Sequence, residues 1–176
     1  MFVRPEEIIA QSHIHEGMKV VDVGTGGSLY ILLVGHKVGR QGRVYAVDVQ
    51  QELLSKIKNA ARAEHLENIA IIPANIEKEG STGIATDSID KVLLLNVLYQ
   101  LEDKEGALRE CRRMLDPFGE LILVDWSESF GNMGPHKDHV FNKEAAAKLF
   151  LKNGFRIDRE LVVGDYHYGL ALKKEI

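Results

Sequence analysis

The sequence is poor in cysteine, proline and tryptophan. Its 176 residues include one cysteine, Cys111, so an intramolecular disulfide and a zinc site built from several cysteines are both excluded. A low cysteine content is typical of proteins in a reducing compartment. We therefore expect a cytoplasmic protein, and we expect no metal site.

Positive charge and long apolar runs are also scarce. The chain has 22 Lys and Arg residues against 26 Asp and Glu residues, a formal net charge of −4. This balance argues against nucleic acid and against an anionic membrane surface as partners, because both attract strongly basic patches. No apolar run approaches the roughly 20 residues needed to span a bilayer. The first residues lack the charged-then-apolar layout of a signal peptide, so we expect no membrane partner.

What the sequence does contain is a regular alternation of apolar runs and amphipathic segments. The length suits one domain, and we expect a single domain over residues 1–176. The patterns predict strands at 19–23, 43–47, 69–73, 90–95, 120–126, 155–163 and 166–173. They predict helices at 28–38, 50–65, 103–115 and 142–153, the third ending at Asp116-Pro117 because proline cannot extend a helix.

This order predicts an α/β fold with a mostly parallel sheet. Strands that alternate with helices form parallel sheets covered on both faces, and the nearly continuous apolar strands agree with burial on both sides. Gly164-Asp165 is typical of a hairpin turn and would make the last strand antiparallel. The expected fold is a Rossmann-like three-layer α/β/α sandwich with seven strands and an antiparallel C-terminal hairpin strand.

Three glycines within four positions follow the first predicted strand. Gly24, Gly26 and Gly27 allow the backbone to turn sharply and allow a ligand to come close. In open parallel sheets, ligands bind beyond the carboxyl ends of the strands, where the strand order reverses. The helix that starts near Ser28 also offers free backbone N–H groups there.

An acidic residue ends the second predicted strand. Asp48 lies 22 residues after Gly26, and an acid about 20 residues past such a loop binds the ribose hydroxyls of nucleoside cofactors. A dinucleotide site would need G-x-G-x-x-G, but Leu29 stands where the third glycine belongs. The alternative interpretation of Asp48 is an acid that caps the next helix.

The stretch from Asp22 to Ser28, D-V-G-T-G-G-S, resembles the D/E-x-G-x-G-x-G signature of the class I S-adenosylmethionine-dependent methyltransferases, with Ser28 in place of the last glycine. Segments 43–49, 73–76, 90–101, 113–126 and 153–155 are similar to later segments of that family, in the same order. The branch most similar to this chain contains small-molecule enzymes such as the quinone-biosynthesis and arsenite methyltransferases.

The resemblance implies a cofactor, S-adenosylmethionine, with S-adenosylhomocysteine as its product. Asn75 stands where the family usually has an Asp for the adenine amino group, and Ile76 would pack against the adenine ring. The cofactor-binding residues implied by the resemblance are Asp22, Gly24, Thr25, Gly26, Ser28, Asp48, Val49, Asn75, Ile76, Asn96 and Val97.

Methyl transfer from a sulfonium does not require a dedicated catalytic residue, because the cofactor supplies the leaving group. The protein aligns the acceptor and removes a proton where needed. Candidates lie in loops after the strands: Tyr99, Asp125 and His139. Each has a structural alternative, since Tyr99 could pack under the next helix, Asp125 could be a cap, and His139 could be an ordinary surface residue.

The sequence favours a small-molecule acceptor. Arsenite chemistry needs several thiols, and the chain has one. Enzymes that methylate amino groups of nucleic acid bases often carry Asn/Asp-Pro-Pro-aromatic after the fourth strand, where this chain has Asn96-Val97-Leu98-Tyr99. The segment before the first strand is short, which fits an open site for a larger acceptor or a lid from the partner subunit of a homodimer. An RNA or protein methyltransferase and a non-catalytic cofactor-binding module remain the alternatives.

Overall fold

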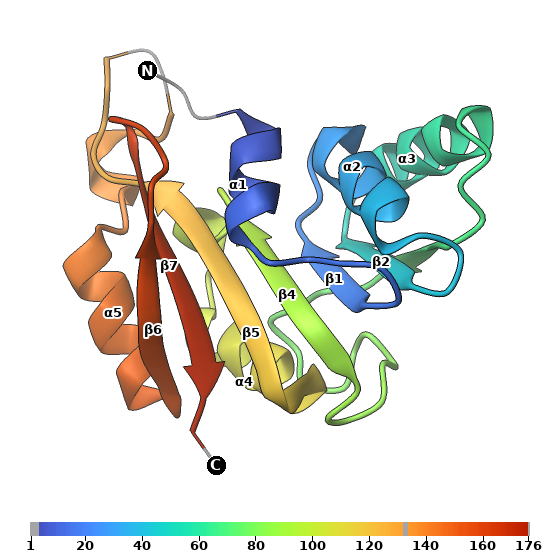
Figure 1. Ribbon diagram of the computed structural model, residues 1–176. Helices are drawn as coiled ribbons and strands as arrows, with labels where there is room; N and C mark the ends of the chain where they lie inside the picture. Colours follow the sequence, from blue (N-terminus) through green and yellow to red (C-terminus); the bar gives the residue numbers. More distant parts are fainter. Residues whose placement is uncertain (1–3, 132–133, 176) are drawn as a thin grey trace.

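A seven-stranded sheet forms the centre of the molecule (Figure 1). The computed structural model describes residues 4–131 and 134–175. The strands are β1 (Lys19–Val23), β2 (Arg43–Asp48), β3 (Ile69–Pro73), β4 (Ile89–Leu95), β5 (Leu115–Trp126), β6 (Phe155–Leu161) and β7 (His167–Lys174). Their order across the sheet is β3-β2-β1-β4-β5-β7-β6.

The strand order reverses between β1 and β4. Val21 of β1 pairs with Tyr45 of β2 on one side and with Val92 of β4 on the other, and all three strands are parallel. β7 pairs antiparallel with both β5 and β6. The predicted α/β fold with a mostly parallel sheet and an antiparallel C-terminal strand is confirmed. A ligand site is expected next to the reversal, at the carboxyl ends of β1 and β4.

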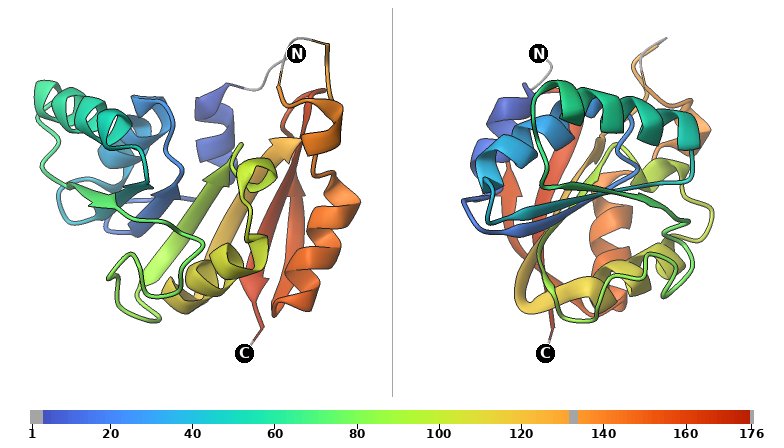
Figure 2. Two further views of the ribbon diagram at one scale, coloured as in Figure 1. Left: turned by 180° about the vertical axis from the view of Figure 1, so that it is seen from behind. Right: turned by 90° about the vertical axis from the view of Figure 1, so that its right-hand side faces the viewer.

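Helices cover both faces of the sheet, which gives three layers (Figure 2). One apolar cluster packs Ile8 of α1 (Pro5–Gln11), Ile31 of α2 (Ser28–Val38) and Leu54 of α3 (Gln51–Ala63) on one face. A second cluster packs Leu108 of α4 (Lys104–Met114) and Phe150 of α5 (Lys143–Lys152) on the other. Two short 3-10 helices are η1 (Leu98–Gln100) and η2 (Lys137–His139). Among the described residues, no helix has both the length and the apolar character needed to cross a membrane.

The predicted end of the helix before Asp116-Pro117 is confirmed to within one residue, but the predicted start of the next strand at Glu120 is wrong. Helix α4 ends at Met114 and β5 begins at once with Leu115, so the proline lies inside a strand rather than between elements. Leu115 pairs with Ile89, the register then shifts, and regular pairing resumes at Lys91 and Glu120. A proline has no N–H for a ladder, and the irregular stretch between these two pairings accommodates it.

The prediction of a tight two-residue turn at Gly164-Asp165 was also wrong. Strand β6 already ends at Leu161 and β7 starts at His167, so the connection is longer. Helix α1, which the sequence analysis did not anticipate, uses the backbone between them. The Gln11 amide donates to the carbonyl of Val162 at 2.9 Å, and the Val162 N–H donates to Gln11 Oε1 at 2.8 Å. Since both backbone groups of Val162 bond to α1, they are not available to extend the β6–β7 ladder.

Candidate functional site

A cavity of about 490 Å³ opens at the carboxyl ends of β1, β2 and β3 and against the segment that follows β4. Its charged lining residues are all acidic: Asp48, Glu77 and Glu102. The other lining residues are Val23, Gly24, Gly26, Val47, Val49, Gln50, Ala74, Asn75, Ile76, Val97, Gln100 and Leu101. The cavity therefore lies next to the reversal of strand order, where an open α/β sheet binds its ligand.

The segment 24–27 between β1 and α2, here called the glycine loop, forms one wall of this cavity. Gly24 and Gly26 have φ values of 62° and 50°, in the left-handed region that favours glycine. A Cβ on Gly24 would lie 2.6 Å from Cγ2 of Val97, so any larger residue would displace the segment after β4. Gly27 is the N-cap residue of α2, and it has no side chain that could accept a hydrogen bond from the first N–H groups of the helix. The first N–H groups of α2 are thus left without a side-chain acceptor, as the sequence predicted.

Asp48 ends β2 at the edge of the cavity. Its side chain is nearly buried, with 7% of the residue exposed. Oδ1 accepts a hydrogen bond of 2.8 Å from the N–H of Gln50, which holds the carboxylate against the turn. A carboxylate fixed at this place can accept hydrogen bonds from two neighbouring hydroxyl groups of a ribose.

Three buried polar atoms near the ends of β1 and β4 lack a hydrogen-bond partner within the part of the chain that the structure describes: Asp22 Oδ2, Thr25 Oγ1 and Asn96 Oδ1. Burial, together with the nearby charge of Asp48, raises the pKa of Asp22 to about 7. Orphaned buried acceptors are costly unless a ligand or water satisfies them. These atoms belong to residues next to Val23, Gly24 and Val97 of the cavity lining, so donor groups of a ligand or of ordered water close to this wall would satisfy them.

The wall opposite the glycine loop comes from the residues after β3. Oδ1 of Asn75 accepts from the N–H of Glu77 at 2.9 Å, so this oxygen already has one bond within its own turn. Oε1 of Glu77 accepts from the N–H groups of Glu102 at 2.6 Å and Asp103 at 3.2 Å. This bridge ties the segment after β3 to the segment before α4, and both line the cavity.

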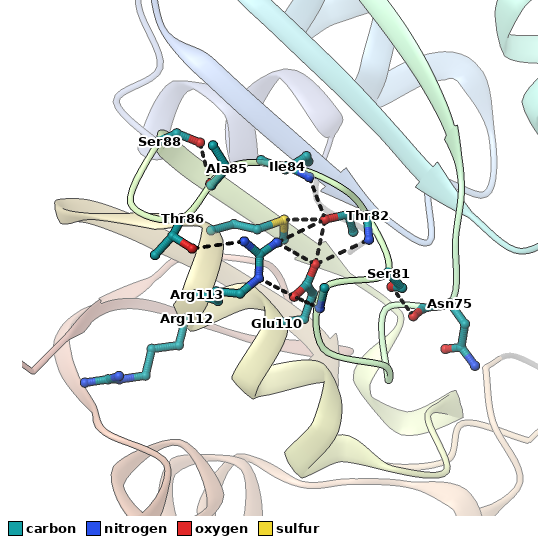
Figure 3. Close-up of polar contacts among 12 residues, drawn as sticks. Asn75, Ser81, Thr82, Ile84, Ala85, Thr86, Ser88, Glu110, Arg112 and Arg113 are labelled. Atoms are coloured by element: carbon teal, nitrogen blue, oxygen red, sulfur yellow. Dashed lines mark hydrogen bonds and ion pairs between the residues drawn. The ribbon is translucent and has the colours of Figure 1, made fainter.

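The loop from Glu77 to Ser88 takes the place of a helix between β3 and β4, and a buried carboxylate holds it on α4 (Figure 3). Glu110 of α4 accepts from Thr82 Oγ1 at 2.6 Å, from the Gly80 N–H at 2.7 Å and from Arg113 Nε at 2.7 Å. Burial pushes the pKa of Glu110 up, but these hydrogen bonds outweigh burial and hold the pKa at about 2. Glu110 is therefore charged. It holds the segment from Gly80 to Thr82, which follows the cavity-lining residues 74–77 along the chain.

The three candidate catalytic residues lie in different settings. Tyr99 is half-buried in η1, where burial and then the charge of Asp125 raise the pKa of its phenol. Asp125 is fully buried and accepts from the backbone N–H groups of Tyr99 and Trp126. His139 is exposed in η2, within the loop between β5 and α5. The described residues that line the cavity include none of the three, so a catalytic role for each stays a prediction.

The structure brings most of the predicted cofactor residues together. Gly24, Gly26, Asp48, Val49, Asn75, Ile76 and Val97 line the cavity. Asp22, Thr25, Ser28 and Asn96 belong to the same strand ends and loops but lie outside the lining. Sequence reasoning missed eight of the lining residues: Val23, Val47, Gln50, Ala74, Glu77, Gln100, Leu101 and Glu102. Only their position near the ends of predicted elements could have indicated them.

The fold and the site together define an open α/β protein with an acidic, glycine-lined cavity at the carboxyl ends of its strands. A family profile described as a methyltransferase domain matches residues 14–161. The chain belongs to this methyltransferase-domain family, as the glycine loop and Asp48 indicated.

Curated relatives carry related names. The chain is 32% identical over 115 residues to an arsenite methyltransferase of Aquipseudomonas alcaligenes, covering 62% of this chain and 33% of that protein. It is 27% identical over 121 residues to a ubiquinone/menaquinone biosynthesis C-methyltransferase of Shewanella baltica, covering 68% of this chain and 47% of that protein. The chain thus spans between a third and a half of the length of these relatives.

Solved structures show the same fold over almost the whole chain. A SAM dependent methyltransferase from Aquifex aeolicus superimposes with a TM-score of 0.88 at 26% identity, covering 97% of this chain and 89% of that one. The [4+2]-cyclase SpnF superimposes with a TM-score of 0.83 at 15% identity, covering 98% and 80%. At that identity the second likeness concerns the fold alone.

Proposed function

We propose that this protein is an S-adenosylmethionine-dependent methyltransferase that acts on a small-molecule acceptor. The observation that carries the proposal is the cavity at the strand ends that the glycine loop and Asp48 line together. In this proposal, Asp48 binds the ribose hydroxyls, Asn75 and Ile76 hold the adenine, and the glycine loop receives the amino acid part. The name of the Aquifex aeolicus structure supports the choice of cofactor.

The charge of the cavity supports this cofactor over a nicotinamide dinucleotide. Asp48, Glu77 and Glu102 line it, and the described lining residues include no Lys, Arg or His. A dinucleotide would bring two phosphate charges next to these carboxylates, and like charges at short range repel. S-adenosylmethionine carries an ammonium and a sulfonium, which an acidic, partly buried site attracts.

The chemistry asked of this chain is mainly alignment. When bound, S-adenosylmethionine supplies a methyl group on a sulfonium that an acceptor displaces in line. The walls after β3 and β4, tied together by Glu77 and its bonds to Glu102 and Asp103, hold the adenosine half in one orientation. Tyr99, Asp125 and His139 remain the candidates for contact with the acceptor or for removing its proton.

A small organic acceptor fits better than an arsenical, despite the similarity to an arsenite methyltransferase. The single thiol, Cys111, is fully buried in α4. Burial, and then the charge of Glu110, raises the pKa of Cys111 to about 12, so the thiolate that would bind arsenic does not form at neutral pH. The net charge of −4 counts against an RNA acceptor.

The remaining features of the proposal concern the whole protein. We propose a single domain that works in the cytoplasm, and a homodimer in which the partner supplies a lid over the site. Helix α1 has seven residues and the described lining of the cavity includes none of them, which supports a lid that comes from elsewhere. Light scattering with size-exclusion chromatography measures the oligomeric state.

The proposal is tested with methyl-labelled S-adenosylmethionine and a fractionated extract of small metabolites. Label is expected to appear in a small organic product, and to be lost when an excess of unlabelled S-adenosylhomocysteine competes with the labelled cofactor for the site. Label found only in RNA, together with RNA binding that weakens steeply with salt, would support the alternative acceptor. Cofactor binding without transfer to any acceptor would favour the non-catalytic module.

A further inference from the structure

The carboxylate of Asp125 is bonded to backbone groups on two segments. Asp125 lies near the end of β5 and is fully buried. Its Oδ2 accepts a hydrogen bond of 3.1 Å from the N–H of Tyr99, and its Oδ1 accepts one of 2.8 Å from the N–H of Trp126. One side chain thus fixes the end of β5 to the first turn of η1, 26 residues earlier in the chain.

The segment that Asp125 holds is a wall of the cofactor cavity. Val97, Gln100 and Leu101 all line the cavity, and they directly precede, end and follow η1. Val97 also lies so close to the glycine loop that a Cβ on Gly24 would clash with it. Just before it, Asn96 has a φ of 57°, in the left-handed region that asparagine adopts more readily than other non-glycine residues and that marks a sharp turn after β4.

We propose that Asp125 is a positioning residue: its two backbone hydrogen bonds hold the η1 segment against the glycine loop in the geometry that binds the cofactor. The proposal rests on the proposed function for the identity of that cofactor. Asp125 itself does not touch the cofactor in this account; it acts through Val97, Gln100 and Leu101.

This role requires two acceptor oxygens. A carboxylate presents an acceptor to each N–H, whereas an asparagine presents one oxygen and turns its NH₂ group toward the other N–H. Protonation has a similar effect, because a carboxylic acid carries a donor on one oxygen.

The ionisable groups near this carboxylate are Tyr99 of η1, Lys104 of α4 and Tyr168 of β7, and Glu144 of α5 lies near Tyr168. Burial outweighs the hydrogen bonds and raises the pKa of Asp125 to about 6.

The test compares Asp125→Asn with a matched control, Asp116→Asn. Asp116 lies near the other end of the same strand, where its Oδ1 accepts from the N–H of Phe118 at 2.8 Å, away from the cavity. The affinity for S-adenosylhomocysteine is measured by calorimetry at pH 7.5 and pH 5.0, and the thermal midpoint confirms folding. Amide hydrogen exchange at residues 98–100 is measured in the ligand-free proteins.

At pH 7.5, Asp125→Asn is expected to bind about 10- to 100-fold more weakly than the wild type, and Asp116→Asn within about twofold, because each hydrogen bond to a charged group is worth about 1.5–3 kcal/mol. The wild type is expected to approach the Asp125→Asn variant at pH 5.0, since its own carboxylate is then mostly protonated. Unchanged affinity in folded Asp125→Asn, or a ratio of affinities that does not vary with pH, would overturn the proposal.

The proposed function can fail separately. If the wild type binds no S-adenosylhomocysteine, the cofactor assignment fails, and hydrogen exchange alone decides on Asp125. Faster exchange confined to residues 98–100 in Asp125→Asn, with Asp116→Asn unchanged, then supports the positioning role, whereas unchanged exchange refutes it. If Asp125→Asn does not fold, the same exchange measurement on the wild type at pH 5.0 and pH 7.5, corrected for intrinsic exchange, tests the same bond.

Discussion

Three buried aspartates near the carboxyl ends of β2, β1 and β5 have different hydrogen-bond environments because their neighbours differ. Asp48 lines the cavity and has one oxygen bonded to a local backbone N–H. Asp22 of β1 has Oδ2 unpartnered in the described chain, and burial, followed by the charge of Asp48, raises its pKa. Asp125 has both oxygens occupied by backbone donors. The sequence predicts that these acids lie at or next to the ends of strands. It could not predict which backbone groups they would bond, because those contacts are made only in the folded protein.

The ribose assignment predicts the effect of one substitution. Asp48→Asn retains an oxygen for the N–H of Gln50 but removes the charge, and it is expected to weaken S-adenosylhomocysteine binding by about 10- to 100-fold. Asp90→Asn is the matched control, because Asp90 Oδ2 accepts from the N–H of Lys19 at 2.7 Å at the amino ends of β4 and β1, away from the cavity. Calorimetry on the two folded variants measures the difference. Equal affinities for Asp48→Asn and the wild type would rule out ribose binding by Asp48.

At the level of secondary-structure elements, local signals explain what could be predicted. The glycines at positions 24, 26 and 39 punctuate β1 and α2, and both elements have the predicted bounds. Pro117 misled the prediction, because a bulge in the β4–β5 pairing lets a strand contain it. The hairpin was predicted too tight because the contact between Gln11 and Val162 joins residues 151 positions apart. Such tertiary contacts leave no mark on local sequence.

The connection between β3 and β4 carries a prediction of its own. Glu110→Gln removes the charge that binds Arg113 and the loop from Gly80 to Thr82, and it is expected to lower the free energy of unfolding by about 3 kcal/mol at pH 7. Because the pKa of Glu110 is lowered from 4.5 to about 2, its contribution is present above pH 4.5 and is lost as the pH falls toward 2. Urea unfolding at several pH values measures both effects.

The control for this experiment is Glu105→Gln on the same helix. Glu105 forms an exposed ion pair of 2.8 Å with Lys152, and exposed pairs contribute no more than about 1 kcal/mol. A stability difference between Glu110→Gln and the wild type that persists unchanged at pH 2, or that matches Glu105→Gln at pH 7, would contradict the anchoring role of Glu110.

At the level of the whole molecule, the fold places the site but does not fix the reaction. The order β3-β2-β1-β4-β5-β7-β6 creates the reversal beside which the cavity opens. The same fold occurs in a methyltransferase and in a [4+2]-cyclase. Function therefore has to be argued from the side chains that line the site. Here the lining consists of the glycine loop, the acid Asp48 that we propose to bind ribose, and two further acids, Glu77 and Glu102.

The central claim is that this acidic cavity binds S-adenosylmethionine. The most direct measurement is a parallel calorimetric titration of the protein with S-adenosylmethionine, S-adenosylhomocysteine and NAD. We expect the first two to bind with dissociation constants on the order of micromolar, about −8 kcal/mol, and NAD to show no binding. Binding of NAD, or no binding of either S-adenosyl compound by the folded protein, would contradict the account.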